Sequence, residues 1–298
     1  MYKFVKIMNN SDAGSSMEQF VKMPVYVGFL IKMTAQLLSH PMELVRVNIQ
    51  ANVIHHSHLN MQNMFRLMAR HGLPGFYYGI VASGLRCTVH TLSTYTLFYN
   101  LRDNKYVLML KPYNTSTVLG LTGFWGGVLA TPFAKLAVIR QADLTRSSYQ
   151  RRNYRNFWLG LKCMYRKGGF IYLFNGWQIN AFSSTSVAML YNPISDKVHT
   201  LISWFHGLDE PWLSDLITMA LTGGIITVIM TPVDGIAILT LNESSYGHHS
   251  YASMCRKIIK RHGYRGFFFG WRPALVALVP HTLLATIVYR VLLDRYLS

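Results

Sequence analysis

Charged residues are scarce in this chain, and acidic residues are scarcer still. Asp, Glu, Lys and Arg make up only 14% of the 298 residues, whereas about a quarter of the residues in soluble domains are charged. The 12 acids face 29 Lys and Arg, so that the formal net charge is +17 at pH 7. Such a charge favours an anionic partner, and nucleic acid and anionic lipid are the two obvious choices.

Cysteine is also rare. Cys87, Cys163 and Cys255 are widely spaced and odd in number, which excludes a disulfide framework and matches no metal-ligand spacing. The chain also lacks a phosphate-binding glycine loop and a serine with a histidine and an acid at a recognisable spacing. We therefore expect no enzyme, no cofactor and no metal site. No cleavable secretory signal is expected either, because the first 20 residues contain no long apolar run.

Hydrophobic residues, in contrast, make up 51% of the chain and gather in six runs. Some runs approach the ~20 residues that a transmembrane helix needs and others fall short, and each alone could be a buried core helix. All contain polar residues, which inside a membrane must face protein or water. Six such runs favour a helical membrane bundle around a water-filled cavity, and nucleic acid binding would not explain them. The runs are Met23–Gln50, which Lys32 interrupts, and then Cys87–Leu101, Pro112–Ala134, Trp177–Ser195, Leu216–Val233 and Pro273–Tyr289.

Two sequence elements recur three times. A proline segment appears as HPMELVRVNIQ (40–50), TPFAKLAVIRQ (131–141) and TPVDGIAILTL (231–241), with copies about one hundred residues apart. A glycine–aromatic segment follows each copy, and a new apolar run starts directly after it. These second segments read RHGLPGFYYG (70–79), RKGGFIYLFNG (166–176) and RHGYRGFFFG (261–270). The unit of apolar run, proline, basic loop, glycine–aromatic turn and apolar run therefore accounts for nearly the whole chain.

This pattern resembles the mitochondrial carrier family over residues 20 to 298. The family signature P-x-[DE]-x-x-[KR] is matched fully by Pro41, Glu43 and Arg46. The resemblance implies an all-α membrane protein with six transmembrane helices in three tandem pseudo-symmetric repeats, monomeric and multi-pass in the mitochondrial inner membrane. Short amphipathic helices are expected on the matrix face near 60–70, 154–166 and 251–261, and both termini on the cytosolic side. The expected parts are a polar tail (1–19) and repeats 20–111, 112–209 and 210–298.

The resemblance also implies a matrix gate, in which acids and bases of neighbouring odd-numbered helices pair across the threefold axis. Its residues are Pro41, Glu43, Arg46, Gln50, Pro132, Pro232 and Asp234. The second copy has Ala134 and Ala137 in place of the acid and the base, and Ala237 replaces the base of the third. We expect Arg46 to pair with Asp234 and Glu43 to lack an evident partner unless Lys135 reaches it. The alternative for Glu43 and Arg46 is an exposed pair at a helix end.

Three further stretches are similar to the 2-oxoglutarate/malate and dicarboxylate branch of the family: Gly84–Tyr99, Ala137–Leu161 and Leu278–Thr286. In that branch, arginines on the even-numbered helices bind the substrate, and arginine suits carboxylates because its donors are bidentate. This chain keeps only one of four, with Ser183 and Ala277 at two of the lost positions. Arg86 has the alternative of reaching the membrane surface near its helix start. The implied substrate residues are Arg86, His90, Thr94, Asn180 and Ser183.

Two more sites follow from the resemblance. The cytosolic gate would use Phe98, Arg102 and Asp196, although the motif [FY]-[DE]-x-x-[KR] is worn in all three copies. Cardiolipin would bind at Gly79, Gly176 and Gly270, where even-numbered helices begin, because helix N-termini favour phosphate. The segments 46–78, 140–175 and 242–270 hold 16 of the 29 Lys and Arg and only two acids. Such a one-sided basic collar suits an anionic leaflet.

Two functions remain open at this point. The first is an antiporter of small organic anions, such as 2-oxoglutarate or malate, working by alternating access. The second is a carrier-fold protein with lost or altered exchange, which acts as a scaffold or receptor or transports a less charged solute. The intact motif at Glu43 and Arg46 favours the first. The missing cavity arginines and the two broken gate copies favour the second.

Overall fold

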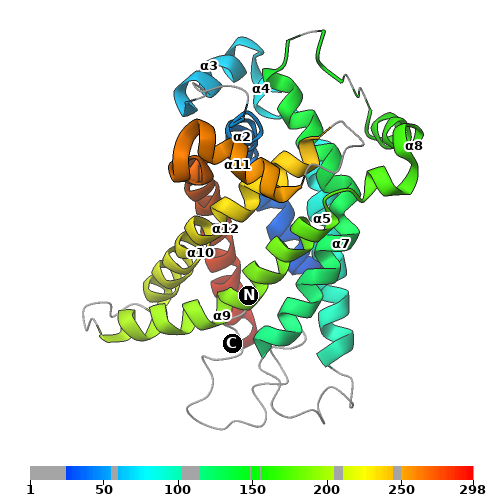
Figure 1. The fold of residues 1–298 in the computed structure, drawn as a ribbon. Coiled ribbons are helices and arrows are strands. Elements are labelled where there is room, and N and C mark those ends of the chain that lie inside the picture. Colours follow the sequence, from blue (N-terminus) through cyan, green and yellow to red (C-terminus); the bar gives the residue numbers. More distant parts are fainter. Residues whose placement is uncertain are drawn as a thin grey trace.

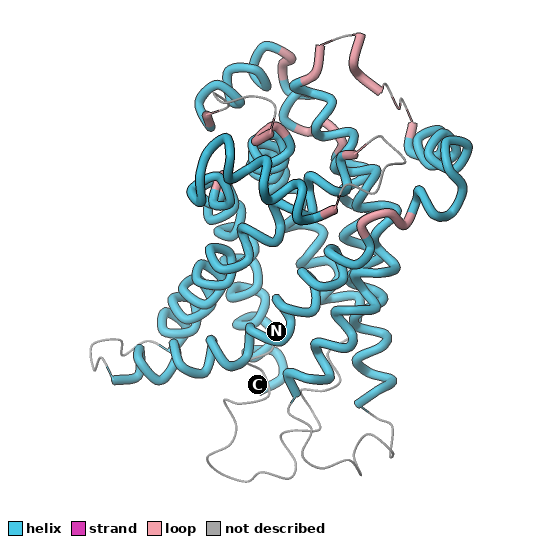
Figure 2. Tube along the Cα trace, viewed as in Figure 1, coloured by secondary structure: helices cyan, strands magenta, loops and turns pink. Residues whose placement is uncertain are grey.

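The structure is a computed structural model, and it is built almost entirely of helices (Figures 1 and 2). No strand occurs in the part of the chain that it describes, which confirms the all-α expectation. The predicted N-terminal tail, residues 1–19, lies outside that part. The described residues are 25–54, 60–102, 115–147, 149–152, 154, 156–204, 211–243 and 250–297.

Long helices alternate with short ones in an order that recurs three times. The long helices are α2 (Val25–Ala51), α5 (Ile80–Arg102), α7 (Thr115–Ala142), α9 (Trp177–Trp204), α10 (Pro211–Asn242) and α12 (Trp271–Leu297). The shorter elements are α3 (Met61–Arg70), α4 (Leu73–Phe76), η2 (Asp143–Thr145), α8 (Phe157–Leu173), α11 (Tyr251–His262) and η3 (Gly263–Phe268). Helices therefore lie where the sequence predicts the three short ones, and α8 runs on across non-helical backbone at Gly168 and Gly169.

Each of the three recurring prolines lies inside a long helix. Pro41 is in α2, Pro132 in α7 and Pro232 in α10, and all three helices continue beyond it. A proline inside a helix removes one backbone hydrogen bond. Helices of 27 to 32 residues tolerate that loss because their remaining hydrogen bonds are intact.

Hydropathy alone identifies fewer membrane spans than the six long helices. By length and composition, three described stretches can cross a membrane: Ser116–Thr145, Leu213–Asn242 and Tyr251–Leu284. The other long helices, α2, α5 and α9, are diluted by polar side chains such as Lys32, Glu43, Arg86 and Asn180. Such residues lower the mean hydropathy without preventing a span, provided that they face the inside of a bundle.

The six long helices contact one another as a closed ring in chain order, with α12 returning to α2. The short helices α3, α8 and α11 lie at one end of the molecule, which we call the short-helix end (Figure 1). The long helices come together there. Toward the opposite end α9 and α10 spread away from α5 and α7 (Figure 1). The bundle is thus closed at the short-helix end and wider at the other.

The glycine–aromatic turns help to hold this closed end together. Gly79, Gly176 and Gly270 all have φ between 82° and 91°, a left-handed conformation that favours glycine. Each also packs against the long helix of the following repeat, where an added Cβ would lie 3.1–3.2 Å from the nearest side chain. Their neighbours are Gln141 for Gly79, Leu241 for Gly176 and Gln50 for Gly270. The three contacts close a cycle around the bundle.

Candidate functional site

A carboxylate and a guanidinium meet between α2 and α5. The Nη2 of Arg86 lies 2.7 Å from Oε1 of Glu43. Ser83 donates to both oxygens of the same carboxylate at 3.1 Å, and Gln36 donates to Oε2. The sequence left Glu43 without a partner, and this expectation was wrong. The pair went unseen because its members are 43 residues apart and come from different motifs.

A second ion pair joins α2 to α10. Arg46 donates from Nη2 to Oδ2 of Asp234 at 2.6 Å, which are the two side chains that the sequence predicted to pair. Ser183 of α9 donates to the other oxygen of Asp234 at 2.7 Å. Gln50 accepts from Nε of Arg46 at 3.4 Å and donates to the carbonyl of Phe269 at 3.2 Å. The chain of contacts therefore runs from α5 through α2 and α10 to α9.

Both ion pairs are accessible to water although they lie inside the ring of helices. The side chains of Arg86 and Glu43 are 35% and 17% exposed, and those of Arg46 and Asp234 are 27% and 23% exposed. A partly exposed ion pair is worth only ~0–1 kcal/mol, and salt screens it. Contacts of that strength can break and re-form, as a gate requires.

Helix α7 contributes no charge to this network and closes the bundle with apolar side chains instead. Ala134 packs in an apolar cluster that draws on α2, α7 and α10 and lies toward the short-helix end from Arg46 and Asp234. We call this the central apolar cluster. Its members are Val47, Ala51, Ala134, Val138, Ala142, Ile238 and Leu241, all at most 7% exposed. Ala137 is buried beside it against α8. Of the motif positions without a charge, Ala134 thus packs inside the bundle and Ala137 packs against α8.

Lys135 does not serve Glu43. Its side chain is fully buried, and its Nζ lies 3.9 Å from the centre of the Tyr172 ring in α8, on the outer side of α7. Within the described residues this nitrogen has no hydrogen-bond partner. Lys135 directly follows motif position 134 and comes two residues before motif position 137. On a helix that displacement turns the side chain away from the bundle centre.

Polar contacts between repeats surround the closed end. Asn48 of α2 donates to the carbonyl of Gln141 at 3.0 Å, and Arg152 donates to the carbonyl of Asn242 at 3.0 Å. His262 donates from Nε2 to the carbonyl of Val53 at 2.9 Å. These three contacts connect the first repeat to the second, the second to the third and the third to the first. They reinforce the ion pair of Arg46 and Asp234, which also joins two repeats.

The predicted substrate residues do not all gather in one place. Arg86 and Ser183 reach the network described above, through Glu43 and Asp234 respectively. Thr94 is buried between α5 and α7, with its hydroxyl donating to the carbonyl of His90. Asn180 donates to the backbone of α7 at Gly127. Thr94 and Asn180 thus hold helices together in this conformation.

Sequence reasoning missed three polar residues that the fold brings to the interior. Gln36 contacts Glu43, and Ser39 lies 3.3 Å from Nε2 of His281 in α12. Lys32 of α2 approaches the Tyr95 ring, with Nζ 5.6 Å from its centre. The available signal was Lys32 itself, because an ionisable residue inside an apolar run indicates a functional site.

Of the predicted cytosolic gate, only part can be placed. Phe98 lies on α5 with its ring edge-on to that of Tyr99, and Asp196 lies on α9, near the end of the bundle opposite the short helices. The side chain of Arg102 is outside the described part of the chain. These residues stay predicted gate residues.

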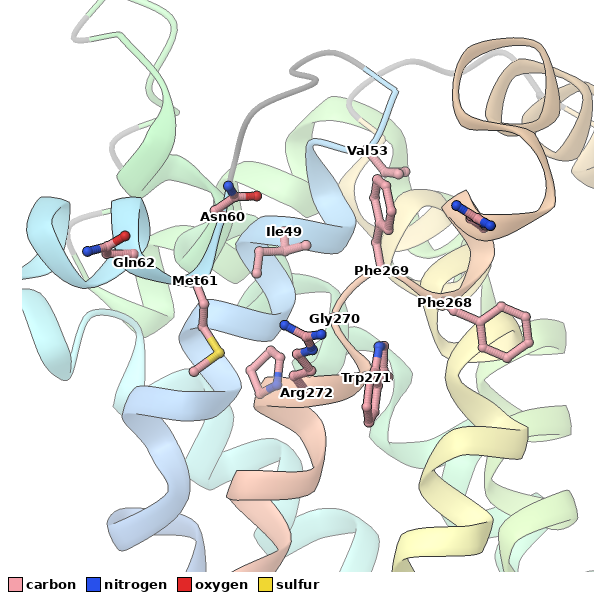
Figure 3. A pocket seen from close by; sticks show the side chains of 12 residues that line it. Ile49, Val53, Asn60, Met61, Gln62, Phe268, Phe269, Gly270, Trp271 and Arg272 are labelled. Atoms are coloured by element: carbon pink, nitrogen blue, oxygen red, sulfur yellow. The ribbon is translucent and has the colours of Figure 1, made fainter.

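A cavity of about 640 Å³ lies at the short-helix end beside Gly270 (Figure 3). It is bordered by the end of α2 and by the starts of α3 and α12, whose unpaired backbone N–H groups favour anions. Arg265 and Arg272 add two positive charges to its lining. Phe269 directly precedes Gly270, and Arg272 follows it by two residues.

Chemically, this arrangement can bind and release charged solutes, and it holds no constellation suited to bond-making. In the described ranges, no three His, Cys, Asp or Glu side chains come together as metal ligands. The interior contains cations, imidazoles and hydroxyls, and the ion pair of Arg46 with Asp234 forms a breakable closure at the short-helix end.

Comparison with known proteins agrees with this picture. The family model described as mitochondrial carrier protein matches residues 21–106 and 209–298. The chain is 27% identical over 276 residues to the mitochondrial citrate transporter F of Aspergillus niger, covering 90% of this chain and 88% of that protein. It is 28% identical over 276 residues to a mitochondrial dicarboxylate transporter of Candida glabrata, covering 90% and 92%. To the mitochondrial dicarboxylate carrier of Caenorhabditis elegans it is 27% identical over 270 residues, covering 89% and 91%.

Proposed function

Because the chain belongs to the mitochondrial carrier protein family, whose members are transporters and not enzymes, we propose that it exchanges small organic anions across the mitochondrial inner membrane. Dicarboxylates such as malate and 2-oxoglutarate are the first candidate substrates. Relatives at 24–28% identity are named as carriers of citrate, dicarboxylates or 2-oxoglutarate and malate. The short-helix end would face the matrix, and six long helices would cross the membrane.

The observation that carries this proposal is the breakable closure at one end of an otherwise open bundle. Arg46 and Asp234 join two repeats, and both stay about a quarter exposed. Opening on the matrix side needs this pair and the polar contacts around it to separate, while the opposite ends of α5, α7, α9 and α10 close. Alternating access around a site near the middle of the membrane follows from such a rearrangement.

Exchange by the purified protein in liposomes tests the proposal. Vesicles preloaded with malate, 2-oxoglutarate or citrate should take up labelled malate, whereas vesicles without internal substrate should not. The Arg46→Ala variant should lose most of this exchange, and Lys162→Gln, which removes an exposed positive charge on α8, should retain it. Absence of exchange by the folded parent protein with all three anions would contradict the proposal.

The alternative, a carrier fold with lost or altered exchange, has its own support. Three of the four expected cavity arginine positions are Thr94, Ser183 and Ala277, and the central apolar cluster includes Ala134, where the motif has an acid. A dry apolar seal costs free energy to open, because its surface must meet water. If the protein is a scaffold or receptor, it should be folded and stabilised by lipid, but it should exchange no anion.

We also propose that the cavity beside Gly270 binds the phosphates of cardiolipin. Its support is the combination of two helix N-termini with Arg265 and Arg272. Gly79 and Gly176 begin even-numbered helices in the same conformation and remain proposed lipid sites. Cardiolipin should raise the melting temperature of the detergent-solubilised monomer, and Arg272→Gln should weaken that effect more than Arg166→Gln on α8 does.

A further inference from the structure

Lys32 is an unexplained cation in the interior of the bundle. It lies in α2 seven residues after the helix begins, which places it roughly 10 Å along the helix axis. Its side chain is only half-buried, and its Nζ is directed to the Tyr95 ring of α5. His90 lies on the same helix as Tyr95, and Nε2 of His281 on α12 lies 3.3 Å from Oγ of Ser39, seven residues after Lys32 on α2. Lys32 is thus directed from α2 to α5 and does not reach for the membrane surface.

Among the described residues of this interior, two of the three cations have a carboxylate partner and Lys32 has none. Arg46 is paired with Asp234, and Arg86 is paired with Glu43. Lys32 forms no ion pair in the described part of the chain. A buried or half-buried charge without a counter-ion is costly in a membrane protein. Among the described residues one positive charge is therefore left without a counter-ion, which a bound anion would supply.

We infer that Lys32 is the anchoring cation of the anion site, and that the state closed at the short-helix end prefers a ligand with one carboxylate over one with two. This rests on the proposed function as an anion carrier. The carboxylate would lie beside the Lys32 ammonium, with the nitrogens of His90 and His281 as further hydrogen-bonding groups. Tyr95 supplies an aromatic face that holds the ammonium when no ligand is bound.

Glu43 accounts for the preference between one carboxylate and two. The second carboxylate of a malate would seek the Arg86 guanidinium, a second cation, which α5 directs toward α2. That guanidinium already binds Glu43 at 2.7 Å, and Ser83 and Gln36 hold Glu43 in place. A dicarboxylate must displace this internal carboxylate, whereas a monocarboxylate needs only Lys32.

Ligand-induced thermal stabilisation of the purified, detergent-solubilised protein tests the inference, with pyruvate and malate as the probes. Lys32→Gln should raise the apparent Kd for both anions about tenfold or more, as expected when a charged hydrogen bond is lost. Lys32→Arg should keep most of the affinity, and the matched control Lys162→Gln should bind as the parent does. Glu43→Gln should tighten malate relative to pyruvate, because it frees Arg86.

Folding is checked in the same assay without ligand. An uncompensated cation is removed in Lys32→Gln, so its unliganded melting temperature should equal or exceed that of the parent. Equal anion affinity in Lys32→Gln and the parent would overturn the inference and leave the proposed exchange standing. Lys32-dependent binding without any exchange in liposomes would support the inference and contradict the proposed function. A parent protein that no anion stabilises, or a lower unliganded melting temperature in Lys32→Gln, would also overturn the assignment.

Discussion

At the scale of single residues, two of the three motif copies lack charged positions, and this changes the ion pairs that the remaining charges form. The first repeat keeps acid and base. Arg46 binds Asp234 of the third repeat, which is the predicted partner, whereas Glu43 binds Arg86 of its own repeat, which the sequence did not predict. Arg86 is therefore already paired with Glu43, and in the proposed site it would also have to bind an anion. A substrate that reached Arg86 would loosen Glu43 and so couple occupancy of the proposed site to the state of the closure.

The pair of Arg46 and Asp234 can be tested by exchanging its charges. Arg46→Asp and Asp234→Arg should each lower the melting temperature, because each brings two like charges together. The double variant should recover part of the loss, with a coupling free energy of about 1 kcal/mol for a partly exposed pair. The measurement is a double-mutant cycle by thermal unfolding in detergent. A double variant no more stable than the worse single variant would show that the pair contributes nothing.

Lys135 offers a second test at this scale. Its ammonium is fully buried over Tyr172 without a hydrogen-bond partner in the described chain, and at the equivalent position after Pro41 stands the buried Leu44. Replacing a poorly compensated buried charge with an apolar residue often stabilises a protein by about 1–4 kcal/mol. We expect Lys135→Leu to raise the melting temperature and exposed Lys162→Leu to leave it nearly unchanged. A marked fall for Lys135→Leu would mean that the cation–π contact with Tyr172 outweighs the cost of burial.

At the scale of elements, the end of α7 is tied to the end of α10 by one buried arginine. Arg152 is 7% exposed in its side chain and pairs with Asp143, which is 2% exposed, at 3.2 Å, and it also donates to the carbonyl of Asn242. This contact joins the second and third repeats, whose gate positions Ala134 and Ala237 carry no charge. The closed end thus keeps a contact between these repeats, in which the charged Arg152, held by Asp143 of its own repeat, donates hydrogen bonds to Asn242 of the third.

Removing this contact should be expensive. Arg152→Ala leaves the Asp143 carboxylate buried without its cation, and breaking a buried pair in this way costs about 3–5 kcal/mol. The expected result is a clearly lower melting temperature, with partial recovery when Asp143→Asn is added because the unpaired charge is then gone. Arg166→Ala, an exposed position on α8, is the matched control. Equal melting temperatures for Arg152→Ala and the control would contradict the role given to Arg152.

At the scale of the whole molecule, the ring of six long helices predicts a definite sidedness in the membrane. Cys163 on α8 and Cys255 on α11 lie at the short-helix end, and Ser203 lies near the far end of α9. In intact mitochondria with permeable outer membranes, a membrane-impermeant maleimide should label Ser203→Cys and should label Cys163 and Cys255 only after the inner membrane is opened. Ser203→Cys is made in a variant in which the three native cysteines are replaced, and that cysteine-free variant is the control. Labelling of all three positions from one side would contradict the six-span arrangement.

Much of the architecture could be read from periodic features of the sequence. The three prolines, the glycine–aromatic segments and the six apolar runs predict the alternation of long and short helices, because helix breakers and apolar periodicity act locally. The pairing of Arg46 with Asp234 was also predictable, since the resemblance to the carrier family implies that acids and bases of neighbouring odd-numbered helices pair across the threefold axis. Hydropathy was less informative for α2, α5 and α9, because inward-facing polar side chains dilute their apolar character.

The sequence by itself determined which helices form and where one gives way to the next. It also determined that most of the positive charge lies on the connecting segments of one side of the bundle. Only the tertiary structure decided which side chains meet. It gave Glu43 the partner Arg86, buried Thr94 between two helices, turned Lys135 outward to Tyr172 and left Lys32 as a cation without an ion pair in the described chain. The physical reason is that helix formation depends on neighbours within one or two turns. The balance of charges inside a bundle depends instead on the rotation and approach of helices far apart in the chain.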